Sequence, residues 1–129
     1  MSWFWRFGPA LIIMAIIFLA SAVPGSEMPS FGIWDTLIKK SGHFLGFALL
    51  AAAFCHALIG SRKASLTHFL IAFILTALYA VLDEWHQQYV TGRTPSLRDM
   101  GIDSIGGLIS LVLFFIVRMQ RKALPPAQI

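Results

Sequence analysis

Four long apolar stretches, separated by short polar segments, dominate the chain. They run from about Phe7 to Val23, Gly42 to Ile59, Leu66 to Leu82 and Gly101 to Val117. Each approaches the roughly 20 residues that an α-helix needs to cross a hydrocarbon core about 30 Å thick. The pattern therefore predicts an all-α polytopic membrane protein, a bundle of four transmembrane helices. Because the spans consume most of the chain, we expect a single membrane domain over residues 1–129.

The composition supports a membrane protein over a soluble one. Hydrophobic residues form 57% of the 129 positions and charged residues only 12%, whereas a soluble domain usually carries about 25% charged residues. A protein core cannot shelter so large an apolar fraction in so short a chain. Lipid must therefore cover most of the surface.

Charged residues divide unevenly between the two ends of the predicted spans. All six acids fall at one end: Glu27, Asp35, Asp83, Glu84, Asp99 and Asp103. The basic residues at that end are Lys39, Lys40, Arg93 and Arg98, while the other end carries basic residues without a carboxylate: Arg6, Arg62, Lys63, Arg118, Arg121 and Lys122. Positive charge favours the cytoplasmic side, so we expect both termini in the cytoplasm and the acids outside. The basic balance then reflects topology, and no nucleic-acid partner is expected.

The first span admits a second interpretation. Residues 20–22, Ala-Ser-Ala, follow an apolar run and resemble a signal-peptidase site, and cleavage there would leave three spans with the N-terminus outside. However, Arg6 is the only basic residue before the run, which makes a weak start for a signal peptide. Pro24 and Gly25 fit the end of an uncleaved helix, since proline cannot continue the helical pattern and glycine tolerates the exit geometry.

Polar residues gather where the third span ends, in the run from Asp83 to Arg93. If the helix continues beyond the apolar stretch, Asp83, His86 and Gln87 share one face through i, i+3 and i+4 spacing, and Glu84 pairs similarly with Gln87. Ionisable groups so close to hydrocarbon are costly and normally turn towards the bundle interior or water. The run therefore predicts a buried polar site. The alternative is that these acids simply mark where the helix leaves lipid.

The fourth span begins with a polar stripe. Ser96 and Asp99 match a capping box, in which the hydroxyl and the carboxylate satisfy exposed amides of the first helical turn. Asp99 can therefore serve as a cap, as part of a site, or as both. Asp103 lies one turn deeper, where no cap needs it, and this favours a functional role. Gly106 and Gly107 predict close packing against a neighbouring helix.

A histidine with two lysines opens the second span. His43 follows Lys40 and Lys39 at i+3 and i+4, so one of the lysines can stand beside the imidazole. Gly42 and Gly46 form a small-xxx-small pair, which is expected to let this helix pack tightly. His43 should lie at the same depth as the acids of the third and fourth spans, and we expect it to join them.

Three other side chains lie away from this cluster. Cys55 is alone in the middle of the second span, so it cannot form an intramolecular disulfide and is expected to pack as a small residue. His56 and His68 fall near the opposite ends of the second and third spans. We interpret both histidines as interfacial or structural.

Several motifs occur in a fixed order along the chain. They are Ser21-x-x-Pro24, Lys40-x-x-His43, Asp83-Glu84-x-x-Gln87, and Gly92-Arg93 followed by Ser96-x-x-Asp99-x-x-x-Asp103-x-x-Gly106. Their order and spacing resemble those of the VanZ-like membrane proteins over nearly the whole chain, from about residue 21 to 107. That family usually has an acid where this chain has Lys39, and most often an asparagine where it has Asp103. The second difference adds a carboxylate to the predicted site.

The resemblance implies a small multi-pass protein of the bacterial cytoplasmic membrane that acts at the cell envelope. The founding member of the family is associated with resistance to the glycopeptide antibiotic teicoplanin, and a similar role is what the resemblance implies here. The positions that match the family motifs coincide with those selected from the residues: Lys40, His43, Asp83, Glu84, Gln87, Arg93, Asp99 and Asp103.

The first of three hypotheses is a head-group site. Arg93, Lys40 and Arg98 would hold the phosphate of a membrane lipid or a lipid-linked cell-envelope precursor, because arginine offers a planar fork of donors and lysine a point charge. Glu84, Gln87 and Asp99 would complete the binding residues. Whether a reaction follows is left open. If one does, His43, Asp83 and Asp103 are the candidate catalytic residues, with a general base among them.

The other two hypotheses assign the same polar groups differently. A divalent cation, the only cofactor considered, could be held among carboxylates and an imidazole: Asp83, Glu84, His86, Asp99 and Asp103. No tight metal-binding motif supports this hypothesis. In the third hypothesis the charges pair to lock a non-enzymatic scaffold, or form a small cation or proton pathway. A pathway is disfavoured because the opposite half offers only His56 and His68.

Overall fold

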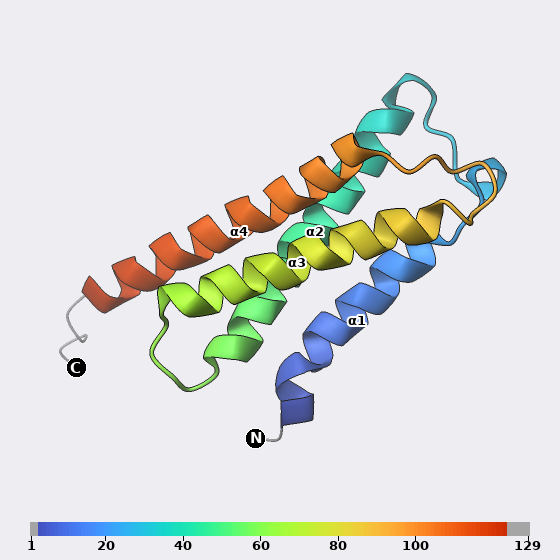
Figure 1. Cartoon of the computed structure of the whole chain (residues 1–129). Coiled ribbons are helices and arrows are strands. Elements are labelled where there is room, and N and C mark those ends of the chain that lie inside the picture. Colours follow the sequence, from blue (N-terminus) through green and yellow to red (C-terminus); the bar gives the residue numbers. More distant parts are fainter. Residues whose placement is uncertain (1–2, 124–129) are drawn as a thin grey trace.

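The structure, a computed structural model, describes residues 3–123 as long helices joined by short connections (Figure 1). The first two and last six residues of the predicted domain lie outside this range. The long helices are α1 (Trp3–Ser21), α2 (Asp35–Ile59), α3 (Leu66–Gln87) and α4 (Leu97–Ala123), and two short 3-10 helices, η1 (Gly25–Glu27) and η2 (Gly32–Trp34), lie between α1 and α2. The predicted all-α fold is confirmed for the described residues.

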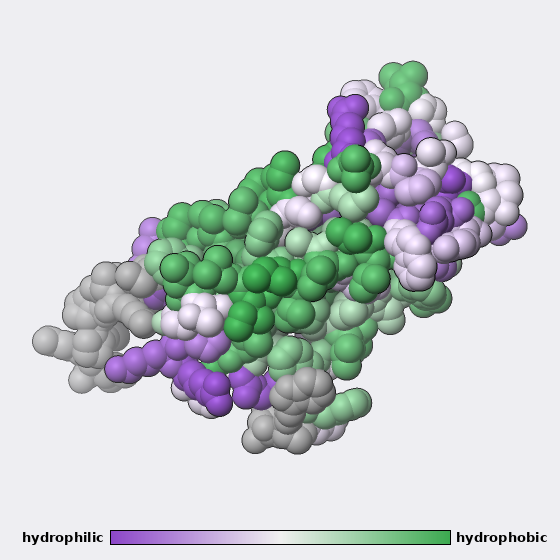
Figure 2. Space-filling view, in the orientation of Figure 1, coloured by the Kyte–Doolittle hydropathy of each residue, from purple (hydrophilic) through white to green (hydrophobic). Residues whose placement is uncertain are grey.

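All four long helices are long and apolar enough to cross a membrane. Their outward faces carry large apolar side chains, such as Leu45, Leu78 and Val112, which are at least half exposed. Figure 2 shows a hydrophobic band between two hydrophilic ends of the bundle. An exposed apolar band of this kind is stable only in lipid. The chain is therefore a multi-pass membrane protein.

The helices alternate in direction, so the start of α1 and the end of α4 lie at the same end of the bundle (Figure 1). The opposite end is formed by the last turns of α1 and α3 and the first turns of α2 and α4. Every acid of the chain belongs to that end or to the connections there, and we call it the acidic end. We call the other the basic end.

Three helices extend further towards the acidic end than their apolar stretches indicate. Helix α2 begins at Asp35 instead of about Gly42, α3 continues to Gln87, and α4 begins at Leu97 instead of about Gly101. Hydropathy falls at the first charged residues, but a helical backbone can continue through them. Asp35 in the first turn of α2 also complements the positive end of the helix dipole. The polar residues of this end are consequently held on regular helices.

Glycines let α4 approach both α2 and α3 closely. A Cβ atom built on Gly106 would lie 2.6 Å from the Phe44 carbonyl oxygen of α2, and one on Gly107 would lie 2.9 Å from Thr76 Cγ2 of α3. Both distances are too short for carbon, so the contacts require glycine. The predicted packing role of this glycine pair is confirmed.

Polar contacts attach α1 to the rest of the bundle along its length. At the basic end the Arg6 guanidinium donates to the carbonyl oxygens of Ala57 and Leu58, near the end of α2. Towards the middle, the Tyr79 hydroxyl of α3 donates to the Met14 carbonyl oxygen at 2.6 Å. These bonds supply specific attachment where apolar packing in lipid gives little preference for one neighbour over another.

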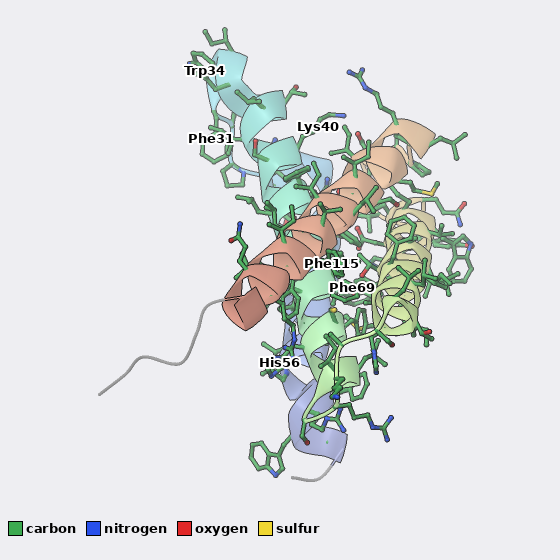
Figure 3. The ribbon with its side chains drawn as sticks, turned by 90° about the vertical axis from the view of Figure 1, so that its left-hand side faces the viewer. Phe31, Trp34, Lys40, His56, Phe69 and Phe115 are labelled. Atoms are coloured by element: carbon green, nitrogen blue, oxygen red, sulfur yellow. The ribbon has the colours of Figure 1, made fainter. Side chains whose placement is uncertain are left out.

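The two histidines of the basic end lie away from the acidic end, as the sequence predicts. His56 lies on the exposed surface of α2, far from Lys40 in the same helix (Figure 3). The Nδ1 atom of His68 accepts a hydrogen bond of 3.1 Å from the Ser65 backbone amide, which completes a capping box at the start of α3. Cys55 is fully buried, in agreement with its predicted packing role.

Candidate functional site at the acidic end

A cavity of about 200 Å³ lies between the ends of α2, α3 and α4. It is lined mainly by charged and polar side chains: Asp35, Thr36, Lys39, Lys40, His43, Glu84, Gln87, Arg93, Asp99, Ile102 and Asp103. Of the positions that the sequence proposed for the site, Asp83, His86 and Arg98 are not part of this lining. We call this space the polar cavity.

His43 lies between two buried carboxylates and the polar cavity. Its Nδ1 atom is 3.6 Å from Asp103 Oδ2 and 4.0 Å from Asp83 Oδ2. Both distances exceed an ordinary hydrogen bond, so the contacts are electrostatic. Asp103 is 1% exposed, and neither of its carboxylate oxygens has a hydrogen-bond partner among the described residues. The site thus contains a buried acceptor group that the surrounding protein leaves unsatisfied.

Both lysines at the start of α2 pair with acids. Lys39 Nζ lies 2.7 Å from Asp35, one turn earlier in α2, while Lys40 pairs with Asp99 across the interface with α4. Because the sequence places the start of the helix too late, it misses the i, i+4 relation between Asp35 and Lys39. All four side chains remain about a third exposed. Pairs this accessible contribute only about 0–1 kcal/mol, so an anionic ligand can compete for the lysines.

Asp83 lies behind the polar cavity and connects α1 to α3. Its Oδ2 atom accepts hydrogen bonds from Ser21 Oγ at 2.8 Å and Gln87 Nε2 at 2.9 Å. These donors hold the carboxylate in place on the side of His43 away from the opening. Ser21 was not among the predicted site residues, although the Ser21-x-x-Pro24 motif already singles it out.

Glu84 supplies the cap that the sequence assigned to Asp99. The Ser96 backbone amide, at the start of α4, donates to Glu84 Oε2 at 2.7 Å. The Ser96 hydroxyl does accept from the Asp99 amide, at 3.4 Å, but the Asp99 carboxylate pairs with Lys40 instead of returning to Ser96. The predicted capping box is therefore only half formed, because a tertiary partner has displaced the local one.

His86 does not join the cluster. Its ring stacks on Phe18 of α1, with 4.3 Å between centroids, so only Asp83 and Gln87 share the face that was predicted for all three. His86 follows Asp83 by three residues, which places its side chain about 60° short of a full helical turn from that of Asp83. This direction brings the His86 ring against α1. Arg98 is exposed and does not line the polar cavity.

These positions bear on the cation hypothesis, which relied on His86. Among the described residues, the structure contains no group of three or more His, Cys, Asp or Glu side chains arranged to hold a metal ion.

Arg93 joins the polar cavity to the end of α1. Gly92, with a φ of 75°, provides the turn before it. The guanidinium donates from Nη2 to the Ala20 carbonyl oxygen at 3.2 Å and from Nε to the Val23 carbonyl oxygen at 3.4 Å. A cation is favoured there because the helix dipole places partial negative charge at this terminus. The segment that resembles a signal-peptidase site thus takes part in the structure of the site, through the Ala20 carbonyl oxygen and the Ser21 hydroxyl.

Replacing Asp103 with asparagine should stabilise the protein. The change keeps the size of the side chain and removes a buried charge that lacks hydrogen bonds. We expect the relief of this desolvation cost to exceed the loss of the electrostatic contact with His43 at 3.6 Å. We expect Asp103→Asn to unfold a few degrees higher than the unmutated protein in detergent. Exposed Asp35→Asn, which loses the pair with Lys39, should change the melting temperature little. A lower melting temperature for Asp103→Asn would show that its charge stabilises the fold.

The fold and the cavity together define a class: small multi-pass membrane proteins with a polar site at one end of a four-helix bundle. The model of the VanZ/LLP1 family matches residues 7–118, and the chain belongs to this family. The match spans every residue that lines the polar cavity, and it confirms the resemblance found in the motifs. No curated protein and no solved structure matches the chain.

Proposed function

We propose that the polar cavity binds the anionic head group of an envelope lipid or lipid-linked cell-wall precursor. In this proposal the acidic end faces outward from the bacterial cytoplasmic membrane, and binding protects the cell envelope against glycopeptides such as teicoplanin. The observation that carries the proposal is the cavity itself, in which Lys39, Lys40 and Arg93 surround a space beside His43 and the unsatisfied carboxylate of Asp103.

The lining of the polar cavity indicates what kind of head group would fit. Its cations suit a phosphate, but it also contains carboxylates, among them Glu84 and Asp103. A phosphate alone would leave the unsatisfied oxygens of Asp103 without donors. A head group that combines a phosphate with hydroxyl or amine donors satisfies both kinds of lining. Lipids with glycerol or sugar phosphates have this combination.

The distribution of charge supports the outward orientation of the acidic end. Arg6, Arg62 and Lys63 lie at the basic end, where no acid accompanies them. Basic residues in short connections favour the cytoplasmic side. The polar cavity would then open towards the leaflet in which envelope precursors are assembled into the wall.

If the ligand is also transformed, we propose His43 as the general base. Its imidazole borders the polar cavity, and Asp103 lies within 3.6 Å of Nδ1. A carboxylate in this position orients an imidazole and stabilises its protonated form. The proposed binding does not require this step.

The alternative hypotheses explain less of the structure. A structural lock has no use for a cavity among its charges. A cation or proton pathway needs polar groups between the ends, but the core between them is apolar and includes Phe47, Leu50 and Phe54. The buried Thr76 hydroxyl donates to the Ala72 carbonyl of its own helix, so it is committed to local bonding.

The test compares two histidines at opposite ends of α2. In a teicoplanin-susceptible host that produces this protein, His43→Gln should reduce protection to the level of cells without it, because the side chain at the polar cavity changes. His56→Gln alters an exposed histidine at the basic end and should protect fully. Immunoblots of membranes establish equal abundance. Full protection by His43→Gln at equal abundance would argue against the proposed site.

A further inference from the structure

The structure contains a second hollow beside the polar cavity, between α1 and α2. Its volume is about 280 Å³. Apart from three residues at one end, its lining is apolar or glycine: Ile16, Ile17, Ala20, Met28, Ile38, Gly42 and Gly46. We call it the lateral groove. It lies on the flank of the bundle, where the hydrophobic band of the helices would meet acyl chains.

The lateral groove and the polar cavity share Lys39, His43 and Arg93. These side chains therefore stand where the two spaces meet, with apolar lining on one side and carboxylates on the other. The chemical groups along a lipid follow the same order: an apolar acyl chain, then a phosphate, then a polar head group. The shared cations lie where a phosphate would sit if its chain occupied the groove.

Gly42 keeps the lateral groove open. A Cβ atom built there would meet nothing within 4 Å, and one on Gly46 would only touch Ile17 at an ordinary 3.4 Å. The sequence predicts that both glycines allow tight packing, and for Gly42 that prediction was wrong. Helix α1 approaches this face at Gly46 but not at Gly42, so the absence of a side chain at Gly42 leaves space instead of permitting a helix contact.

From these observations we propose that the ligand is a lipid whose acyl chain lies in the lateral groove while its head group enters the polar cavity sideways from the bilayer. This inference rests on the proposed function and specifies its ligand. Each space alone is smaller than the roughly 300–1,000 Å³ of typical ligand sites, whereas together they reach that range. An acyl chain gains little free energy by moving from lipid into an apolar groove. The groove therefore selects the shape and orientation of the lipid, and the head group supplies the affinity.

The experiment uses the full-length protein in phosphatidylcholine nanodiscs that contain a minor fraction of phosphatidylglycerol with a diazirine in its acyl chain. This head group has a phosphate and two hydroxyls. After illumination, mass spectrometry should locate the label mainly at groove residues such as Ile16, Ile17 and Ile38. Labelling at these residues should fall when unlabelled phosphatidylglycerol is added, and not when more phosphatidylcholine is added.

Two matched glycine variants test the groove itself. Gly42→Leu fills it and should reduce groove labelling about tenfold, equivalent to about 1.4 kcal/mol of binding. Gly101→Leu makes the same change on α4, where a Cβ atom also meets nothing within 4 Å, and should leave labelling unchanged. Groove labelling that persists at full strength in Gly42→Leu would overturn the inference.

A head-group variant separates this inference from the proposed function. Lys39→Gln should weaken competition by phosphatidylglycerol, because it removes a cation at the junction of the two spaces. If Lys39→Gln weakens binding but Gly42→Leu does not, the head-group site stands and the groove inference fails. If unmutated protein shows no preference for phosphatidylglycerol over phosphatidylcholine, the head-group proposal fails for this class of lipid, and the groove inference fails with it.

Discussion

Gly106→Ala should destabilise the protein more than any other single-methyl addition to α4. The new Cβ atom would stand 2.6 Å from the Phe44 carbonyl oxygen, a backbone atom that cannot rotate away. Helices α2 and α4 must then separate, at a cost of about 1–3 kcal/mol for overpacking. Because Asp103 lies one turn before Gly106, the separation would also disturb the polar cavity. Reversible unfolding in mixed micelles measures the loss.

Gly101→Ala provides the control for this prediction. It makes the same chemical change in the same helix, at a position where a Cβ atom has open space. Removing glycine from a helix should by itself stabilise it by about 1 kcal/mol. The two variants should therefore move stability in opposite directions. If they behave alike, the close approach of α2 and α4 does not limit stability.

Glu84→Ala should have the largest effect among substitutions of the charged residues. It removes the acceptor of the Ser96 backbone amide, a bond of 2.7 Å that begins α4. Leaving this partly buried donor unpaired costs up to about 1–3 kcal/mol. It also removes the connection between α3 and α4 at the edge of the polar cavity. Thermal unfolding in detergent should show a clear decrease in the midpoint.

Two milder variants identify the bond responsible. Glu84→Gln keeps a side-chain oxygen that can accept from the Ser96 amide, so most of the stability should remain. Ser96→Ala removes only a weak acceptor, at 3.4 Å from the Asp99 amide, and should cost less than Glu84→Ala. If Ser96 and Asp99 formed a complete capping box, Ser96→Ala would cost more stability than Glu84→Ala. A larger loss for Ser96→Ala than for Glu84→Ala would restore Asp99 and Ser96 as the main cap.

The sequence predicts the helices of this protein well because lipid imposes a simple requirement. Only a long apolar helix satisfies its backbone in hydrocarbon, so apolar runs reveal the spans directly. Hydropathy cannot locate the ends of the helices at the acidic end. Helix α2 begins a full two turns before the apolar run, and those turns carry Asp35, Lys39 and Lys40. The sequence consequently names Lys40 as a site residue but does not reveal its ion pair with Asp99.

The partners of the site residues depend on contacts between helices, which spacing along one helix does not reveal. Spacing alone makes Asp99 the cap of α4 and places His86 with Asp83. In the structure the Ser96 amide at the start of α4 donates to Glu84, and the His86 ring stacks on Phe18 of α1. Gathering of the polar residues at one depth was predictable, since each lies near the corresponding end of an apolar run, either within its first turn, as His43 and Asp103 do, or just outside it. The roles of these residues in binding and catalysis remain predictions.

Two arginines attach α1 to the rest of the bundle through backbone atoms, which leaves the side chains at the accepting positions free to vary. At the basic end, Arg6 donates hydrogen bonds to the backbone carbonyl oxygens of Ala57 and Leu58. At the acidic end, Arg93 donates hydrogen bonds to those of Ala20 and Val23. Every amino acid offers that oxygen. The side chains at these four positions can therefore change, for example to match a membrane of another thickness, without loss of the hydrogen bonds. The arginines themselves have no equivalent substitute.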